Sequence, residues 1–243
     1  MTNKHLTLTL ILIAGLALSG CGSHAATAHR SATSSAASST SESQKTPAKS
    51  ASDQATMKPY QVPKSEKQNR DYRRSGLLTL PGQFAYDKVG TKLTLSQNVT
   101  QKHQTASNGI VYRVTDVKRY RNNAKTQRAL SMAEQAFNVA KIPNPYQTIQ
   151  IKFRVKNQSS RAIKIDGITH ATINASRNIE SDGLSDPSAG ATIKAGQTRA
   201  FSAMILAGPT SFKVSQLQIK FSGGFNDAGQ TVIAAPKAIG IQL

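Results

Sequence analysis

The chain has 243 residues and carries 31 Lys and Arg against 12 Asp and Glu, a formal net charge of +19. It contains one cysteine and no tryptophan, and 38% of its residues are hydrophobic. A single cysteine excludes an internal disulfide framework and a zinc site built on several thiolates, so a hydrophobic core must stabilise the fold. The positive excess predicts anionic partners.

An apolar run near the start of the chain predicts export. Lys4 precedes the run Leu6 to Leu18, which is shorter than the ~20 residues that span a bilayer as a helix. The run ends in Leu18-Ser19-Gly20-Cys21, which resembles the lipobox of bacterial lipoproteins. That resemblance implies a diacylglyceryl group on the thiol of Cys21 and cleavage between Gly20 and Cys21. The alternative, an ordinary secretory signal, is disfavoured because the only cysteine stands at this position.

Three segments follow from this interpretation. Residues 1–20 are predicted to be a lipoprotein signal peptide, and two acyl chains on Cys21 to anchor the protein at the extracellular face of the cell membrane. Residues 21–75 are predicted to form a disordered tether. Of the 35 residues from 22 to 56, 24 are Ser, Thr or Ala and none is aromatic, so they cannot build a core. Residues 76–243 are predicted to form the folded domain.

The predicted domain has the periodicity of β-strands. From residue 149 to 156 apolar residues alternate with polar ones, which is typical of a strand with one buried and one wet face. Similar runs occur at residues 92–95, 110–117, 162–165, 171–175, 201–206, 214–221 and 238–243, with Gly- and Asn-containing turns between them. These runs predict an antiparallel β-sandwich, immunoglobulin-like in outline but without the cysteine pair and tryptophan of antibody domains.

One segment departs from this pattern. Residues 125–140 are rich in helix formers, with Leu130 and Phe137 near one face, and Pro143 and Pro145 follow. We predict a short helix inserted between strands and expect it to cover an edge strand. The alternative is that it lines a binding surface.

Two segments resemble a group of Gram-positive surface lipoproteins. One runs from Ile149 to Asn157 and on to Ser159 and Ile163, and the other comprises Ile193 to Thr198 and Phe201 to Leu206. In that group a strand ending in Lys-Asn meets a later Lys-x-Gly-Gln/Glu-Thr turn. The matching positions here are Lys156, Asn157, Lys194, Gly196, Gln197 and Thr198.

The shared domain of that group is immunoglobulin-like, of unknown function, and similar to a secreted mycobacterial immunoprotective antigen. The resemblance covers about residues 90–243. It implies a sandwich with an extracytoplasmic role, and it implies no catalytic residue.

Residue types for catalysis or metal binding are sparse in residues 76–243. His103 and His170 are far apart in sequence and have no cysteine or carboxylate cluster beside them, so we interpret both as solvated. Glu180, Asp182 and Asp186 share one loop without EF-hand spacing, which favours turn chemistry over a Ca²⁺ site. We therefore predict no catalytic residue, no metal, no cofactor and no enzymatic activity.

The remaining chemical signal is charge. Residues 76–243 contain 21 Lys and Arg against 8 Asp and Glu, a net charge of +13. One cluster lies near the start of the predicted helix, and a second lines one face of the strand at 149–156. The candidate polyanion contacts are Lys118, Arg119, Arg121, Lys125, Arg128, Lys152, Arg154 and Lys156.

These features predict a non-enzymatic binding or interaction protein. Besides its lipid contact with the membrane, its basic sandwich is expected to meet anionic wall polymer, lipid headgroups or another envelope protein. The alternative is an accessory or substrate-binding subunit of an envelope enzyme. General surface charge without a specific ligand also stays open. Nucleic acid is a weaker candidate, because only Tyr112 and Tyr120 lie among the basic residues to stack on bases.

Overall fold

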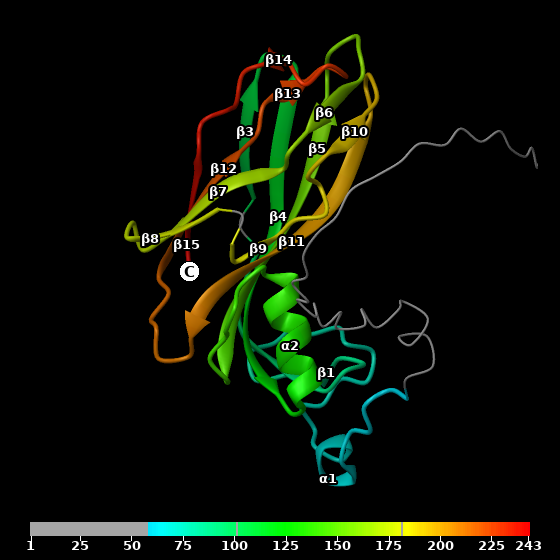
Figure 1. The fold of residues 1–243 in the computed structure, drawn as a ribbon, viewed down its shortest axis with the longest axis vertical. Coiled ribbons are helices and arrows are strands. Elements are labelled where there is room, and N and C mark those ends of the chain that lie inside the picture. Colours follow the sequence, from blue (N-terminus) through cyan, green and yellow to red (C-terminus); the bar gives the residue numbers. More distant parts are fainter. Residues whose placement is uncertain (1–57, 101, 181) are drawn as a thin grey trace, which may run out of the picture. The chain divides into compact units, whose positions relative to one another are not determined.

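The computed structural model describes residues 58–100, 102–180 and 182–243. The chain divides into two units, Met1–Ser50 and Ala51–Leu243, and every described residue lies in the second (Figure 1). The predicted signal peptide, the predicted lipid modification of Cys21 and most of the predicted tether lie outside the described residues. Within the described ranges, no helix is long and apolar enough to cross a membrane.

The folded part begins before residue 76, where the domain was predicted to start. Helix α1 (Lys64–Lys67) forms a single turn, and Tyr60 stacks on Tyr86 with 5.5 Å between ring centroids. Tyr72 forms a β-bridge with Phe84. Unlike the Ser/Thr/Ala-rich segment, residues 58–75 contain aromatic side chains, and Tyr60 and Tyr72 pack on Tyr86 and Phe84. Residues 58–75 are therefore part of the folded unit and not of the predicted disordered tether.

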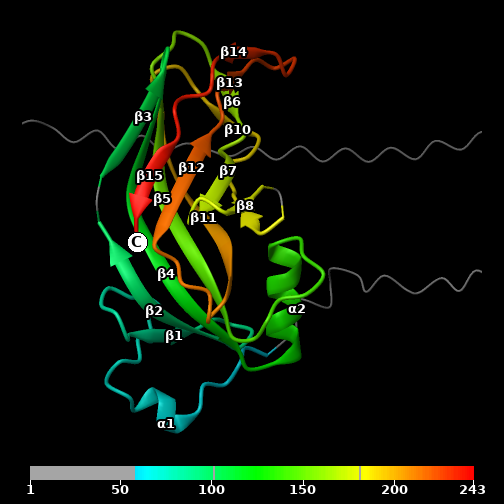
Figure 2. The same cartoon turned by 90° about the vertical axis from the view of Figure 1, so that its left-hand side faces the viewer.

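The largest sheet, sheet A, has the strand order β1-β2-β4-β5-β11-β9, with β3 also paired to β4. Its strands are β1 (Phe84–Tyr86), β2 (Thr91–Val99), β3 (His103–Ser107), β4 (Ile110–Ala124), β5 (Tyr146–Asn157), β9 (Leu184–Ser185) and β11 (Thr198–Pro209). The long strands β4, β5 and β11 connect the upper and lower parts of the unit in Figures 1 and 2.

Two smaller sheets complete the β-structure. Sheet B has the order β10-β6-β13-β14 and sheet C the order β15-β12-β7-β8. Their strands are β6 (Ile163–Ile165), β7 (Ile168–Ile173), β8 (Arg177–Ile179), β10 (Ala191–Ile193), β12 (Gln216–Phe221), β13 (Gly224–Phe225), β14 (Thr231–Ile233) and β15 (Ile239–Gln242). All strand pairs in the three sheets are antiparallel. The predicted mostly-β sandwich with a short helix is confirmed.

Strand β5 organises the main core. It pairs with β4 and β11 without a bulge of its own, so its odd-numbered residues share one face of sheet A. We call this the inner face, because Ile149, Ile151, Phe153 and Val155 are buried there against sheets B and C. Phe221 of β12 packs on Phe153, with 5.1 Å between ring centroids. The resulting sandwich core contains 25 buried residues.

The inserted helix is α2 (Gln127–Ala136). Thr126 caps its N-terminus by accepting a hydrogen bond from the Ala129 N–H at 3.0 Å. The helix ends before the predicted position because Asn138 has a left-handed backbone, with φ 50°. A left-handed residue of this kind ends a helix, so Pro143 and Pro145 are not needed for it. The predicted helix is therefore present but shorter than residues 125–140.

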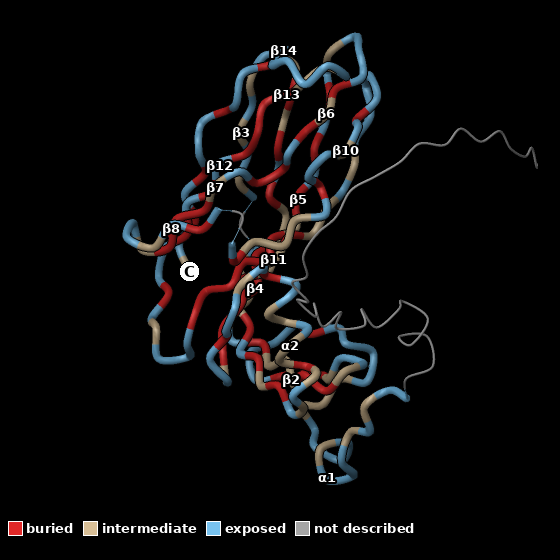
Figure 3. The backbone as a smooth tube through the Cα atoms, in the orientation of Figure 1, coloured by how far each residue is buried: buried red, intermediate tan, exposed pale blue. Residues whose placement is uncertain are grey.

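Helix α2 covers a face of sheet A rather than an edge strand, which corrects our expectation. Tyr146 and Leu206 belong to the outer face, opposite the sandwich core, and pack with Phe137 and Ile142 in a small helix core. A second small cluster, the N-terminal core, comprises Leu78, Ala85, Leu95 and Tyr120. Buried residues therefore continue along the long strands below the sandwich (Figure 3).

Candidate functional site

The upper outer face of sheet A is uncovered and cationic. On β5, Lys152 is half-buried and Arg154 and Lys156 are exposed, all on the face opposite Phe153. The alternation in the sequence predicts this shared face correctly. We define the open face as this uncovered upper part of the outer face, which carries Lys152, Arg154 and Lys156 and is formed where β4, β5 and β11 lie side by side.

Arg113 of β4 belongs to the same surface. It lies directly opposite Arg154 in the β4–β5 register, and it is exposed. Its Nη2 and Nε donate to Gln104 Oε1 at 2.9 and 3.2 Å, which fixes the guanidinium group. The candidate residues predicted from the sequence do not include Arg113. Its polar position within an alternating strand was a signal, but its pairing with Arg154 depends on which strands become neighbours.

A hollow of about 300 Å³ lies among these cations. It is lined by Val111, Arg113, Arg154, Lys156 and Thr198. Within the described ranges, none of the three cations forms an ion pair with a carboxylate. The neighbouring positions on β11 carry the small residues Ala200 and Ser202, opposite Arg154 and Lys152. Small neighbours leave the cationic groups accessible from solution.

The paired arginines are electrostatically unfavourable in the free protein. Like charges directly opposite each other on neighbouring strands destabilise a sheet. An anion placed between Arg113 and Arg154 would remove this repulsion and accept charge-assisted hydrogen bonds from both guanidinium groups. The hollow therefore has the chemistry of an anion-binding surface.

The other predicted contacts do not join this surface. Lys118 is only 6% exposed, and its Nζ donates to the Leu78 carbonyl at 2.8 Å and lies 3.6 Å from Asp116 Oδ2. A buried, paired ammonium group is not available to a polymer in solution, so this assignment is wrong. Arg119 lies on the opposite face and donates from Nη1 to the Val214 carbonyl at 3.0 Å.

The last three predicted cations are separate from the open face as well. Arg121 is exposed and shares the inner-face side with Arg119, below the sandwich core. Lys125 is exposed after the end of β4, and Arg128 is half-buried in the first turn of α2. The two sequence clusters are therefore not one patch, and only the β5 cluster forms a surface with Arg113.

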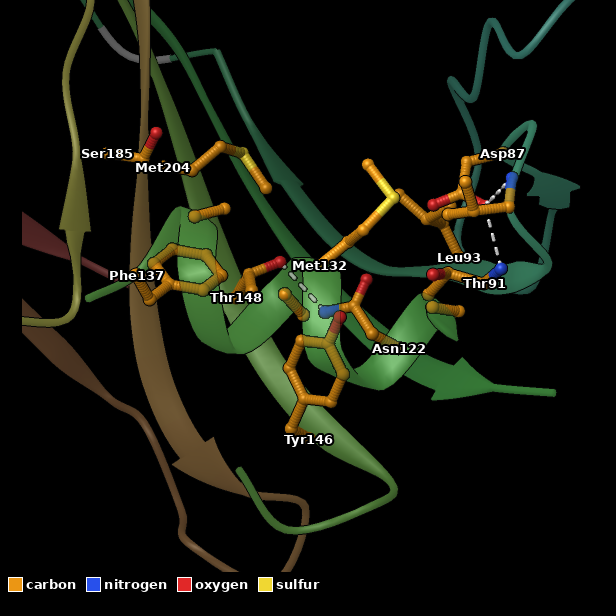
Figure 4. A pocket seen from close by; sticks show the side chains of 14 residues that line it. Asp87, Thr91, Leu93, Asn122, Met132, Phe137, Tyr146, Thr148, Ser185 and Met204 are labelled. Atoms are coloured by element: carbon orange, nitrogen blue, oxygen red, sulfur yellow. Dashed lines mark hydrogen bonds between the residues drawn. The ribbon is translucent and has the colours of Figure 1, made fainter. Parts of the chain in front are cut away.

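A second concave site lies between α2 and the outer face of sheet A. This cavity, of about 270 Å³, is lined mainly by apolar side chains, including Leu93, Met132, Phe137 and Met204 (Figure 4). Its polar floor comes from neighbouring long strands, where Asn122 Nδ2 donates to Thr148 Oγ1 at 2.9 Å.

Tyr146 adds a phenol to the wall of this cavity. Burial, together with the charge of Asp87, raises the pKa of Tyr146 to about 12, against the opposing effect of its hydrogen bond with Thr91. The side chain is therefore neutral near neutral pH. The helix thus lines one wall of this cavity.

His170 and the acidic loop have structural partners. His170 Nδ1 lies 3.5 Å from Glu180 Oε1, and its Nε2 is 3.0 Å from Thr172 Oγ1. Asp186 accepts hydrogen bonds from the backbone N–H groups of Ile168 and Ser188 at 2.7 and 2.8 Å. Across the described residues, no group of three or more His, Cys, Asp or Glu side chains is arranged to hold a metal ion.

Comparison with known proteins provides no family for this chain. No family model matches the sequence, and no curated protein matches it. Among solved structures, "The crystal structure of a functionally unknown protein from Listeria monocytogenes EGD-e" matches 62% of this chain and 86% of that chain. The sequence identity is 13% and the TM-score is 0.41.

Proposed function

We propose that this chain is a lipid-anchored extracytoplasmic protein that binds anionic cell-envelope components on the open face of sheet A and catalyses no reaction. The address is supported by the lipobox-like sequence that ends at Cys21. The binding role is supported above all by Arg113, Arg154 and Lys156, which surround a hollow and have no carboxylate partner among the described residues.

The spacing of the cations suits an extended polymer. Alternate side chains of a strand repeat roughly every 6.6–6.8 Å along one face. Lys152, Arg154 and Lys156 therefore form a regular row, with Arg113 beside its middle member. A phosphodiester polymer with charges at a similar interval can contact several of these groups in turn, and each contact releases bound counterions. Binding should therefore weaken as the salt concentration rises.

The test compares two double variants with the same change in charge. Arg154→Glu with Lys156→Glu alters the open face, whereas Lys213→Glu with Lys220→Glu alters exposed cations in and just before β12 of sheet C. We expect the first pair to lower the affinity for purified teichoic acid about tenfold or more, and the second to have a much smaller effect. Calorimetry across a salt series measures this. Equal losses of affinity in both variants would show that general surface charge, and not a site on the open face, binds the polymer.

The cavity beneath α2 favours one second candidate, an accessory or substrate-binding subunit of an envelope enzyme. Its mainly apolar lining above a polar floor is typical of small-ligand sites, although its volume lies near their lower limit of about 300 Å³. Ala133→Phe should fill the cavity and abolish binding of a fluorescent apolar probe, while binding to teichoic acid persists. Probe binding that is unchanged by the substitution would argue against this candidate.

A further inference from the structure

Two leucine side chains near the start of the folded unit are exposed to solvent. Leu77 is 63% exposed and Leu80 is 62% exposed, whereas Leu78 between them is only 3% exposed. We call residues 76–83 the leucine loop. Single exposed apolar side chains are ordinary on a protein surface. What distinguishes this loop is the way it is built.

Buried polar groups fix the loop from below. Gln83 is 4% exposed, and its Oε1 accepts hydrogen bonds from the backbone N–H groups of Thr79 at 2.8 Å and Leu80 at 3.1 Å. The ammonium group of Lys118 donates to the Leu78 carbonyl, and Asn98 Nδ2 donates to the Thr79 carbonyl at 3.3 Å. Lys118 and Asn98 belong to strands β4 and β2, and Gln83 is the last residue of the loop, directly before β1.

The middle leucine anchors the loop by packing. Leu78 is buried with Ala85, Leu95 and Tyr120 in the N-terminal core. With Leu78 directed inward, its neighbours Leu77 and Leu80 remain outside. Their exposure is therefore a fixed feature of the loop, and a partner that buries them pays little conformational entropy.

The segment that leads into the loop is cationic. Residues 58–80 contain six Lys or Arg, and only Glu66 and Asp71 oppose them. Glu66 is already paired with Lys92 at 2.9 Å. Arg74 is exposed three residues before Leu77, and Lys58, Lys64, Lys67 and Arg70 are exposed earlier in the same segment. Exposed apolar side chains next to a basic segment are the combination that binds the interface of an anionic bilayer.

The loop belongs to the first segment of the folded unit. The described residues begin at residue 58, and the predicted lipid-bearing Cys21 precedes them in sequence. The segment from residue 58 to β1 occupies the lower end of the unit in Figure 1, whereas β13 and β14 occupy the upper end. We propose that Leu77 and Leu80 insert into the interface of an anionic lipid bilayer and dock the folded unit on the membrane. This inference rests on the extracytoplasmic, lipid-anchored location proposed above.

The absence of tryptophan from the sequence allows a direct test. In a chain from residue 22 to 243, which keeps the whole second unit but has no lipid, Leu80→Trp introduces a single fluorescent reporter. Val232→Trp provides the control, because Val232 is 54% exposed in β14 at the other end of the unit. With phosphatidylglycerol-containing vesicles we expect a blue-shifted, quencher-protected emission for Leu80→Trp only. No shift for Leu80→Trp, or equal shifts for both, would overturn the inference.

Loss of the leucines provides the second measurement. Leu77→Ser with Leu80→Ser should lower the affinity for these vesicles about tenfold or more, whereas Val232→Ser should not change it. Thermal unfolding of each variant checks the fold, which exposed side chains should affect little. Binding by the folded serine variant that equals wild type would refute membrane docking by the loop.

Binding to soluble teichoic acid separates this inference from the proposed open-face function. The serine variant should bind the polymer as wild type does, and Arg154→Glu with Lys156→Glu should not. If polymer binding occurs without any vesicle binding, the leucine inference fails and the open-face proposal stands. If vesicle binding depends on the leucines while the polymer does not bind, the open-face proposal fails and the leucine inference stands.

Discussion

The sandwich region and the region below it use the same long strands but bury different faces of them. The sandwich core takes its β5 residues from the inner face and contains 25 buried residues. The helix core and the N-terminal core contain four buried residues each and lie on the outer face. In the upper part, the outer face of the long strands is exposed to solvent. In the lower part, α2 and the leucine loop cover the same face. The two small cores should therefore be the weaker part of the unit.

Alkaline pH should have the largest effect and act first on the lower region. Burial is the main cause that raises the pKa of Tyr86, Tyr120 and Tyr146 to about 12, and it raises that of Tyr112 as well. Since the folded-state pKa values lie above the ordinary value of 10, this stabilisation is complete below pH 10. It is lost as the pH rises towards 12, by up to about 1.4 kcal/mol per pH unit for each fully buried tyrosine.

Urea unfolding at pH 9 and pH 11.5 measures this loss, with tyrosinate absorbance as the probe. Tyr120→Phe with Tyr146→Phe should reduce the dependence on pH, because neither phenylalanine can ionise. A double variant that loses as much stability as wild type between these two pH values would contradict the assignment.

Truncation of a core phenylalanine should distinguish the two regions next. Phe153→Ala removes a side chain that is 1% exposed and packs on Tyr112, Phe201 and Phe221, so we expect a loss of about 3–5 kcal/mol. Phe137→Ala in the helix core should cost about 2 kcal/mol less, because the adjacent cavity lets that site relax. Chemical denaturation of both variants tests the order, and equal losses would show that the two cores are equally tightly packed.

The buried ammonium group of Lys118 should have an intermediate effect. Lys118→Met keeps the stem but leaves Asp116 and the Leu78 carbonyl without this donor, at a cost of about 1–3 kcal/mol. Lys152→Met, on the same face of sheet A, should change the unfolding free energy by less than about 0.5 kcal/mol. If the two variants unfold at the same denaturant concentration, Lys118 does not support the leucine loop.

The smallest expected effect concerns the paired arginines. Arg154→Thr should stabilise the unit by a few tenths of a kcal/mol up to about 1 kcal/mol, because it removes the repulsion across from Arg113. The same variant should bind teichoic acid more weakly. Arg154→Lys keeps the charge and should change both quantities less. A loss of stability in Arg154→Thr would contradict the unfavourable pairing.

Much of the sandwich could be predicted because its signal is local. The alternation at residues 149–156 assigns Ile149, Phe153 and Lys152 to their faces correctly, and a helix is present within 125–140. The short strands β1, β8, β10 and β13 are absent from the sequence prediction, since two or three residues are too few to show a period of two. Tyr60 and Tyr72 belong to the folded unit because they pack on residues of β1, and local composition does not reveal these contacts.

The features of the candidate site were likewise predictable only in part. The sequence by itself determined the charge, the predicted export and lipid signal, the strand periodicity and the common face of Lys152, Arg154 and Lys156. Only the tertiary structure decided that Lys118 is buried, that Arg113 faces Arg154, and that Leu77 and Leu80 remain outside while Leu78 is covered. The periodicity of a strand fixes the side to which each residue points, but long-range pairing decides what lies there.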